Sequence, residues 1–395
     1  MTAADTATPK TGPLKGIKVI ELAGIGPAPY ACMLMSDLGA EVLRLERSRG
    51  GIMGAIAGFD VLSRGRRSVA IDLKAPGARD LVLDLVKQAD VLIEAFRPGV
   101  AERLGLGPED CRGANPRLVY ARMTGWGQTG PLADRVGHDI NYASITGAIA
   151  AVGEKGRKPV PPLNLVADFG GGSMFAVMGI LAALIERTTS GEGQVIDVAM
   201  VDGVTSLLSM AHGQQAAGMM PDARGSSLLD GGAPYYDTYL CSDGEYMSVG
   251  AIEPQFFEAL KQTLDLPDLP GQGDHANWPK MREMIAAKFA TKTREEWTAI
   301  FDEVDACVAP VYWLSEAKTH PHLVARGTLT DVNGIYQPSP APRFSRTPGQ
   351  VGHPAQTPGT DTVEALTDWG VAKDDLNRLL AAGVVTQAQP DPSST

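Results

Sequence analysis

The sequence predicts an α/β protein with a Rossmann-like large domain, built on a parallel sheet, and a smaller α+β domain. Three observations predict it. The 395-residue chain is long enough for two domains. Short apolar strands alternate with helical segments through the first 125 residues, which is typical of a parallel sheet covered by helices. From about residue 237 the pattern changes to a hairpin followed by several helices.

The elements of the large domain can be placed by their apolar runs and turn residues. Strands are predicted at 17–22, 41–46, 68–72, 91–93 and 118–121, and helices at 28–38 and 77–88; a further helix is predicted at 202–220, in the middle of the chain. In the smaller domain, strands are predicted at 238–240 and 246–249 and helices at 254–263, 279–290 and 294–304. The proline-rich stretch 330–360 should be extended, and a last helix is expected at 373–381.

These elements predict a small α+β domain after the large one, and the family resemblance carried by the motifs given below implies that the chain leaves the large domain, builds the small one and returns. The predicted boundaries are 1–198 for the first part of the large domain, 199–236 for a linker, 237–322 for the small domain, 323–341 for a second linker and 342–395 for the return and the tail.

Composition narrows the class of protein. A net charge of −11 argues against nucleic acid or an anionic membrane as the main partner. The four cysteines are far apart, so neither a zinc nor a redox site is expected, and a reducing, cytoplasmic location fits. The first residues lack a secretory signal pattern, and the longest apolar stretch, 174–185, is shorter than the roughly 20 residues of a membrane span.

A glycine turn after the first strand raises one function class. Gly24 and Gly26 resemble the start of a dinucleotide fingerprint, and Glu46 stands where a ribose-binding acid would be. The third glycine is replaced by Pro29, so a tight turn that simply requires glycine is the stronger interpretation.

Cationic side chains follow several predicted strands. Arg47, Lys74 and Arg97 come directly after strands two, three and four, where the crevice of a doubly wound sheet binds ligands. Guanidinium groups bind phosphates well, so a polyphosphate ligand is plausible, and a solvated arginine face is the alternative. The full set is Arg47, Arg49, Arg64, Arg66, Arg67, Lys74, Arg97 and Arg103.

One histidine and one aspartate, 30 residues apart, lie beside glycines. His138 follows Gly137, and Asp168 precedes a Gly170–Gly172 run that is predicted to open a helix near Ser173. A base and an acid of different types suit the movement of a proton on and off carbon, and exposed N–H groups at a helix start could stabilise an anion. A structural histidine and a helix-capping aspartate are the alternatives, and Glu253 could likewise be a cap.

Motifs along nearly the whole chain resemble the family III CoA transferases (CaiB/BaiF-like). They are Gly16-Ile17-Lys18-Val19-Ile20-Glu21-Leu22, Asp37-Leu38-Gly39-Ala40-Glu41-Val42, Ile71-Asp72-Leu73-Lys74, Glu94-Ala95-Phe96-Arg97-Pro98-Gly99-Val100, Thr124-Gly125-Trp126-Gly127, Gly193-Gln194-Val195-Ile196-Asp197-Val198 and Asp305-Ala306-Cys307-Val308-Ala309-Pro310.

Three further segments, around His138, Asp168 and Glu253, are most similar to the racemases of this family, which act on α-methyl-branched acyl-CoA thioesters. The resemblance implies that His138 and Asp168 are the two acid/base groups and that Glu253 supports the histidine. The alternative is a CoA transferase, in which Asp168 would be a nucleophile that takes the acyl group. A dinucleotide-dependent oxidoreductase and a non-catalytic CoA-binding protein are further alternatives.

The resemblance also implies an interlocked homodimer, with each active site between the large domain of one subunit and the small domain of its partner. No cofactor beyond the CoA moiety of the substrate and no metal are expected. CoA binding carries over to Arg47, Ile71, Asp72, Leu73, Lys74, Ala95, Phe96, Arg97, Arg103, Gly137, Asp139, Ile140, Asn141 and Tyr142.

The implied reaction runs through an enolate. His138 would remove the α-proton of one epimer, protonated Asp168 would supply a proton to the opposite face, and the reverse direction exchanges these roles. The N–H groups of Gly170–Gly172 would stabilise the thioester oxygen. A methionine-rich stretch (Met200, Met210, Met219, Met220) could offer an adaptable apolar surface for varied acyl chains.

Overall fold

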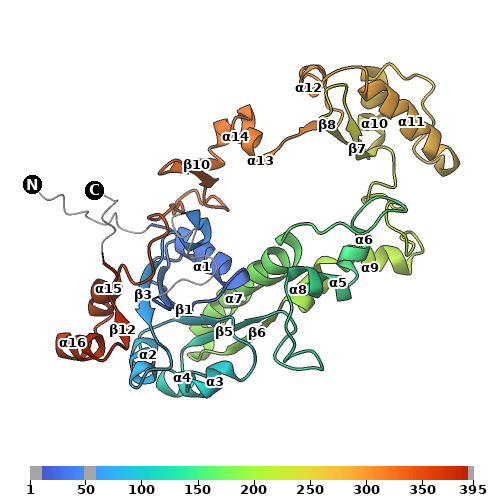
Figure 1. Cartoon of the computed structure of the whole chain (residues 1–395). Coiled ribbons are helices and arrows are strands. Elements are labelled where there is room, and N and C mark those ends of the chain that lie inside the picture. Colours follow the sequence, from blue (N-terminus) through green and yellow to red (C-terminus); the bar gives the residue numbers. More distant parts are fainter. Residues whose placement is uncertain (1–10, 49–58, 390–395) are drawn as a thin grey trace, which may run out of the picture. The chain divides into compact units, whose positions relative to one another are not determined.

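A computed structural model describes residues 11–48 and 59–389 and divides the chain into two compact units (Figure 1). The first unit comprises the chain up to residue 143, residues 164–207 and the chain from 325 onward, and the second comprises 144–163 and 208–324. The second unit therefore takes residues 144–163 from the middle of the predicted large domain, 1–198. Residues 144–163 contact distant parts of the second unit; for example, Arg224 Nε donates to the Ala150 carbonyl at 3.0 Å.

The first unit contains a seven-stranded sheet of order β12-β3-β2-β1-β4-β5-β6. All neighbouring strands are parallel except β12, which pairs antiparallel with β3. The predicted α/β class with a parallel sheet is thus confirmed. The strands are β1 (Lys18–Leu22), β2 (Glu41–Glu46), β3 (Arg67–Ile71), β4 (Val91–Glu94), β5 (Val119–Thr124), β6 (Val195–Ala199) and β12 (Val385–Thr386).

Helices bury both faces of this sheet. Neighbouring residues of β1 belong to different cores: Val19 packs in a cluster with α1 and α7, and Ile20 in a cluster with α2, α15 and α16. Because both faces are covered, the central strands carry buried apolar residues on both sides, as in Val91-Leu92-Ile93 of β4. The helices of this unit are α1 (Pro27–Asp37), η2 (Val61–Ser63), α2 (Ala78–Val86), α3 (Val100–Arg103), α4 (Pro108–Ala114), η3 (Leu165–Ser173), α7 (Met174–Ser190), α8 (Met200–Leu207), α15 (Thr362–Asp368) and α16 (Lys373–Ala381). Two further short helices are α5 (Asp139–Ile145), which ends where the second unit begins, and α14 (Pro321–Arg326).

The second unit has a three-stranded antiparallel sheet of order β7-β8-β9. Its core is aromatic: Phe289 lies 5.3 Å from Trp297 and 6.1 Å from Phe301 between ring centroids. The elements are α6 (Ala148–Ala151), α9 (Ser209–Ala216), β7 (Tyr236–Leu240), β8 (Tyr246–Gly250), α10 (Pro254–Thr263), η4 (His275–Asn277), α11 (Trp278–Phe289), α12 (Arg294–Phe301), β9 (Val308–Val311) and α13 (Leu314–Ala317).

The two predicted linkers contain regular structure. Residues 199–236 hold α8 and α9, because the predicted helix 202–220 is two helices, one in each unit. Residues 323–341 hold the hairpin β10 (Leu329–Val332) and β11 (Ile335–Pro338), where an extended stretch was predicted. Its turn, Asn333-Gly334, has φ values of 53° and 80°, and this dipeptide is a strong hairpin signal.

A continuous helical run, formed by η3 and α7, extends over 26 residues from Leu165 to Ser190. It is longer than the apolar stretch 174–185 that the sequence suggested, and by length and composition it would qualify as a membrane span. Core helices also meet that criterion, and here Ala176, Ile180 and Ala183 pack against the sheet. The run is therefore explained as the helix that covers one sheet face.

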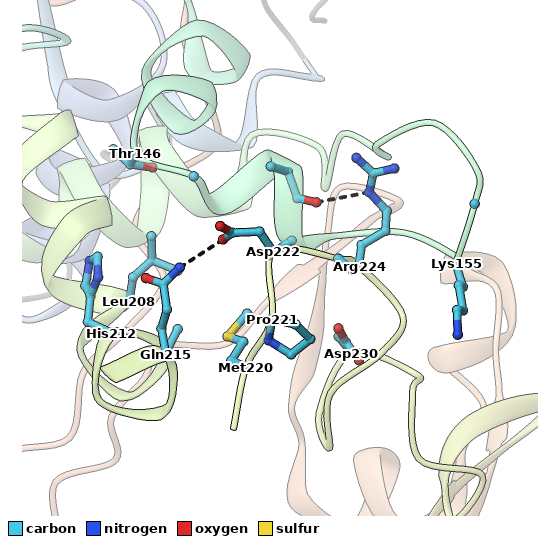
Figure 2. A pocket seen from close by; sticks show the side chains of 16 residues that line it. Thr146, Lys155, Leu208, His212, Gln215, Met220, Pro221, Asp222, Arg224 and Asp230 are labelled. Atoms are coloured by element: carbon cyan, nitrogen blue, oxygen red, sulfur yellow. Dashed lines mark hydrogen bonds between the residues drawn. The ribbon is translucent and has the colours of Figure 1, made fainter. Parts of the chain in front are cut away.

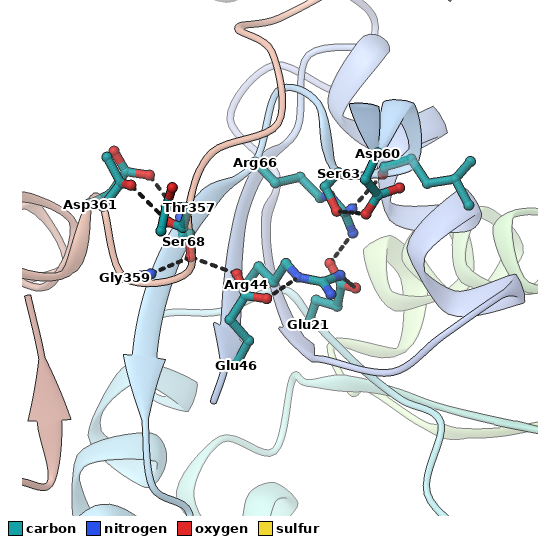
Figure 3. A network of polar contacts seen from close by, with 12 residues as sticks. Glu21, Arg44, Glu46, Asp60, Ser63, Arg66, Ser68, Thr357, Gly359 and Asp361 are labelled. Atoms are coloured by element: carbon teal, nitrogen blue, oxygen red, sulfur yellow. Dashed lines mark hydrogen bonds and ion pairs between the residues drawn. The ribbon is translucent and has the colours of Figure 1, made fainter. Parts of the chain in front are cut away.

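A buried network of ion pairs ties the strands together (Figure 3). Glu21 is fully buried between Arg66 and Arg44, whose Nη1 lies 2.6 Å from Glu21 Oε1. Burial alone would raise the pKa of Glu21, but the two guanidinium groups outweigh it and hold the pKa below its usual value. Arg64 is likewise buried against Asp37, at 2.5 Å. These arginines serve the fold, and so does Arg67, which pairs with Asp368 at 2.7 Å.

Replacing Glu21 with glutamine should destabilise the first unit by about 3–5 kcal/mol, because it leaves the buried Arg66 guanidinium without its counter-charge and removes one of the two carboxylates that pair with Arg44. Urea unfolding at pH 7 measures the loss. Since the folded-state pKa of Glu21 is lowered, its contribution is present above the unfolded pKa and is lost as pH falls through the folded value.

The matched control is Asp84→Asn, which breaks the exposed Asp84–Lys87 pair and should cost less than about 1 kcal/mol. Equal stability of Glu21→Gln and the control would contradict the structural role of the network.

Candidate active site

A cavity of about 530 Å³ opens at the carboxyl edge of the large sheet. Its walls come from the segments that follow β1, β4 and β5 and from η3. The order of the strands reverses between β1 and β4, and ligands of such sheets bind at that point. The structure brings His138 and Asp168, the predicted acid/base pair, to this one cavity. The lining residues are Ile25, Gly26, Pro27, Ala95, Phe96, Arg97, Pro98, Met123, Thr124, Gly125, Trp126, Ala133, Arg135, Val136, Gly137, His138, Tyr142, Asp168 and Met200.

His138 directly precedes α5, and hydrogen bonds fix its backbone on both sides. Its N–H donates to Asn141 Oδ1 at 3.0 Å, and its carbonyl accepts from the Asn141 N–H at 2.8 Å. The Tyr142 hydroxyl donates to the carbonyl of Gly137. The side chain of His138 is exposed on the cavity, so a firmly held backbone presents a solvent-accessible imidazole.

Two glycines make room for the Tyr142 ring. A Cβ on Gly125 would lie 1.9 Å from this ring, and one on Gly137 would lie 2.6 Å from it. Tyr142 also meets Trp126 edge to face, with 4.7 Å between the ring centroids. Any side chain at these glycines would displace Tyr142 and with it the turn that carries His138.

Asp168 lies in the first turn of η3, a π-helical segment. Such segments are rare and often occur at functional sites. Burial raises the pKa of Asp168 to about 6; a hydrogen bond from Asn164 Nδ2, at 3.4 Å, opposes the rise, as does the charge of His138, and the charge of Asp139 adds to it. A carboxyl group with this pKa is present in both protonation states near neutral pH, so it can act as an acid or as a base.

The glycine run after Asp168 has a different role from the predicted one. The helix begins at Leu165, so Gly170–Gly172 lie inside it, where N–H groups bond to the carbonyl five residues earlier. A Cβ on Gly171 would lie 2.8 Å from the backbone nitrogen of Val204 in α8. The run therefore permits close packing of two helices, and the predicted use of its N–H groups as an anion site is wrong. The alternative that Asp168 caps a helix starting near Ser173 is wrong for the same reason.

The Gly24–Gly26 turn is explained by close approaches. A Cβ on Gly24 would lie 3.0 Å from the Ala95 side chain, and one on Gly26 would lie 3.0 Å from Asp168 Oδ2. Gly26 also has a φ of 72°, which favours glycine. Glu46 bonds to Arg44 at 3.1 Å and to the Ser68 hydroxyl at 2.6 Å. The glycines of the turn therefore make room for Ala95 and Asp168, and Glu46 is occupied by Arg44 and Ser68. Neither the turn nor Glu46 supports a dinucleotide site any longer.

The residues predicted to bind CoA fall into two sets. Ala95, Phe96, Arg97, Gly137 and Tyr142 line the cavity, and Arg135, which the sequence analysis missed, joins them. The sequence did offer a signal for Arg135, because it is a cationic residue only three positions before His138. The other predicted CoA residues do not line the cavity: Arg47, Ile71, Asp72, Leu73, Lys74, Arg103, Asp139, Ile140 and Asn141.

Within that second set, burial separates two kinds of residue. Arg47, Lys74 and Arg103 are exposed, whereas Ile71 and Asp139 are buried. Arg49, from the predicted arginine cluster, lies outside the described residues.

Glu253 belongs to the second unit, at the residue before α10. It is exposed, and among the described residues its side chain makes no cap hydrogen bond with that helix. Glu253 therefore occupies the N-cap position of α10, as one alternative expected, but its carboxylate does not bond to the helix and is available for another partner.

A second cavity, of about 520 Å³, lies within the second unit (Figure 2). It is bordered by α6, α9 and the loop 220–230, with Leu208 and Met220 among its apolar residues. Gln215 Nε2 donates to Asp222 Oδ1 at 2.9 Å across one side. Of the methionine-rich stretch, Met220 lines this cavity, whereas Met210 and Met219 are exposed and Met200 lines the first cavity.

Comparison with known proteins shows the family of the chain. The model of the CoA-transferase family III matches residues 14–362, so the chain belongs to this family. A crystal structure of a CaiB/BaiF family protein from Brucella suis has the same fold, with a TM-score of 0.81 at 27% identity over 91% of this chain and all of that one.

Within the family, the chain is more similar to the racemases that match it than to the transferases. The α-methylacyl-CoA racemase of Mus musculus is 45% identical over 94% of this chain and 97% of its own length, and the human one is 43% identical over 93% and 96%. A succinyl-CoA–D-citramalate CoA-transferase of Chloroflexus aurantiacus is 31% identical over 94% of this chain and 98% of its own length.

The variant Gly26→Ala should lower kcat by about tenfold to a hundredfold, because the added Cβ would push on the Asp168 carboxylate and displace it. Epimerisation of a 2-methylacyl-CoA measures the effect. The control is Gly16→Ala, which has a similarly positive φ of 92° but open space around the added Cβ. Equal activities of the two variants would mean that backbone strain, and not contact with Asp168, is responsible.

Proposed function

We propose that the protein is a racemase of 2-methyl-branched acyl-CoA thioesters, acting by 1,1-proton transfer. The observation that carries this proposal is the pairing, in one cavity, of a solvent-accessible imidazole with a carboxyl group whose pKa is raised to about 6. Two such groups can exchange the roles of acid and base. The 43–45% identity with racemases over almost the whole chain supports the same reaction.

The mechanism follows from these two groups. Neutral His138 takes the α-proton from one face of the substrate, and the electron pair of the C–H bond forms the enolate. Protonated Asp168 then gives its proton to the opposite face of the same carbon. The enzyme is left with imidazolium and carboxylate, which is the state that accepts the other epimer in the reverse direction.

The CoA moiety would bind beside this pair at the sheet edge. Arg97 and Arg135 line the cavity, and Arg47 follows the carboxyl end of β2, next to β1 in the sheet. Guanidinium groups are suited to the phosphates of CoA. Arg47, Lys74 and Arg103 remain proposed CoA contacts. A cytoplasmic location, which the spacing of the cysteines favours, is likewise proposed.

We further propose an interlocked homodimer in which the partner's copy of Glu253 supports His138. The support for this arrangement is the family resemblance together with the free carboxylate of Glu253 in the second unit. A carboxylate beside the imidazole would orient the ring and stabilise its charged form.

A CoA transferase is the alternative function, because several transferases match the chain at 27–31% identity and Asp168 faces the same cavity. In that case the Asp168 carboxylate would attack the thioester carbonyl, the C–S bond would break, and the CoA thiolate would leave as a mixed aspartyl anhydride forms. With its raised pKa, Asp168 takes both protonation states near neutral pH, which a racemase requires for its two directions and a nucleophile does not.

Single-base variants separate these functions. His138→Gln and Asp168→Asn should each lose epimerisation by at least about a thousandfold, because each removes one of the two proton-transfer groups. Each should still exchange the α-proton of one epimer with deuterated water, and the two variants should act on opposite epimers. Proton NMR at C2, alongside the epimer ratio, measures both quantities.

If the chain were a transferase, His138→Gln would retain transfer of CoA to an added free acid, and Asp168→Asn would lose it. Exchange of both epimers by both variants would exclude the assignment of one base to each face.

Hybrid dimers test the partner's role. Co-expression of a His138→Ala subunit with a Glu253→Gln subunit should produce hybrids with about half the wild-type activity, because one of the two sites then has an intact His138 and an intact Glu253. Each variant dimer by itself should be nearly inactive. Differently tagged subunits allow the hybrid to be purified, and an inactive hybrid would mean that Glu253 acts within its own subunit.

A further inference from the structure

Asp139 connects the two segments that carry the proposed acid/base pair. Its Oδ2 accepts the backbone N–H of Ala167 at 2.8 Å and that of Asp168, also at 2.8 Å. The side chain is buried, with 8% of its surface exposed. Asp139 directly follows His138 in the sequence. Its carboxylate therefore connects the backbone next to His138 with the backbone of Asp168.

These two hydrogen bonds satisfy a specific need of η3. The first N–H groups of a helix have no partner within the helix, and an acidic side chain there is favoured by the helix dipole. Such a partner usually comes from the residue that precedes the helix. Here the residue before η3 is Asn164, which makes no side-chain cap hydrogen bond among the described residues, and the cap comes from 28 residues earlier in the chain.

The charge of Asp139 also acts on the site. Its Oδ1 is buried and has no hydrogen-bond partner among the described residues. This incompletely compensated carboxylate lies close enough to Asp168 to disfavour a second negative charge there, which adds to the effect of burial on the pKa of Asp168.

We propose that Asp139 is a positioning residue for the proton transfers: its carboxylate holds the turn that carries His138 against the start of η3, which carries Asp168, and it does not bind CoA. This inference rests on the proposed racemase function. It reassigns a residue for which the family resemblance suggested a CoA contact, because its carboxylate is occupied by the backbone of η3.

Two variants separate the effect of the Asp139 hydrogen bonds to η3 from the effect of its negative charge. In Asp139→Ala both hydrogen bonds are lost, and we expect kcat to fall by roughly a hundredfold while the Kd for CoA changes by less than about twofold. In Asp139→Asn the amide oxygen can still accept both N–H groups, so kcat should fall far less. Calorimetric titration with CoA and epimerisation kinetics provide the two readouts.

The pH profile reports the charge. For the epimer whose proton Asp168 removes, kcat/KM in the wild type should rise with pH around a midpoint near 6. Removal of the neighbouring negative charge in Asp139→Asn should move this midpoint down by roughly half a unit to one unit. The control is Asp361→Asn, which alters another carboxylate that accepts a backbone N–H, from Ser68 at 2.8 Å, and should leave the profile unchanged.

A raised Kd for CoA with an unchanged kcat in Asp139→Ala would overturn the proposal in favour of a CoA contact. Unchanged kcat and unchanged pH midpoint in both variants would overturn it outright. Failure of the racemase assignment itself would appear elsewhere, as a wild-type protein that does not epimerise a 2-methylacyl-CoA but transfers CoA to an added free acid, so the two failures are distinguishable.

Discussion

The close packing of η3 against α1 and α8 is the constraint on which the site depends. A Cβ on Gly203 would lie 1.9 Å from the Gly171 carbonyl oxygen, so the two helices approach at a distance that only glycine permits. On the other side, Ser173 Oγ donates to the Pro27 carbonyl of α1 at 2.7 Å. Held on both sides, η3 places Asp168 at the sheet edge beside the start of α1.

Charge at this sheet edge is divided between two tasks, and burial decides which residue performs which. Arg64 and Arg66 are almost fully buried in ion pairs with Asp37 and Glu21 and hold the first strands and helix together. Arg47 and Arg97 are exposed and remain available for an anionic ligand. Residues of one type within a short stretch of sequence therefore differ in role, because the fold sends some inward and others outward.

Much of the fold could be predicted because its signals are local. The α10 bounds, Pro254–Thr263, and the α16 bounds, Lys373–Ala381, agree with their apolar periodicity and flanking turns. The hairpin at Asn333-Gly334 also had a local signal, which the surrounding prolines obscured. The membership of residues 144–163 in the second unit had none, because it depends on contacts with residues near 224.

The sequence by itself determined that His138 and Asp168 are the candidate acid and base. Their residue types, the glycines beside them and the family motifs around them can be recognised without a structure. Tertiary structure alone decided that they share one cavity, that Gly26 is a close approach to Asp168 and that Gly170–Gly172 pack against α8. It also decided that Asp139 faces the backbone of η3. The physical reason is that burial, close packing and a hydrogen bond spanning 28 residues are properties of space, which the order of residues along the chain does not display.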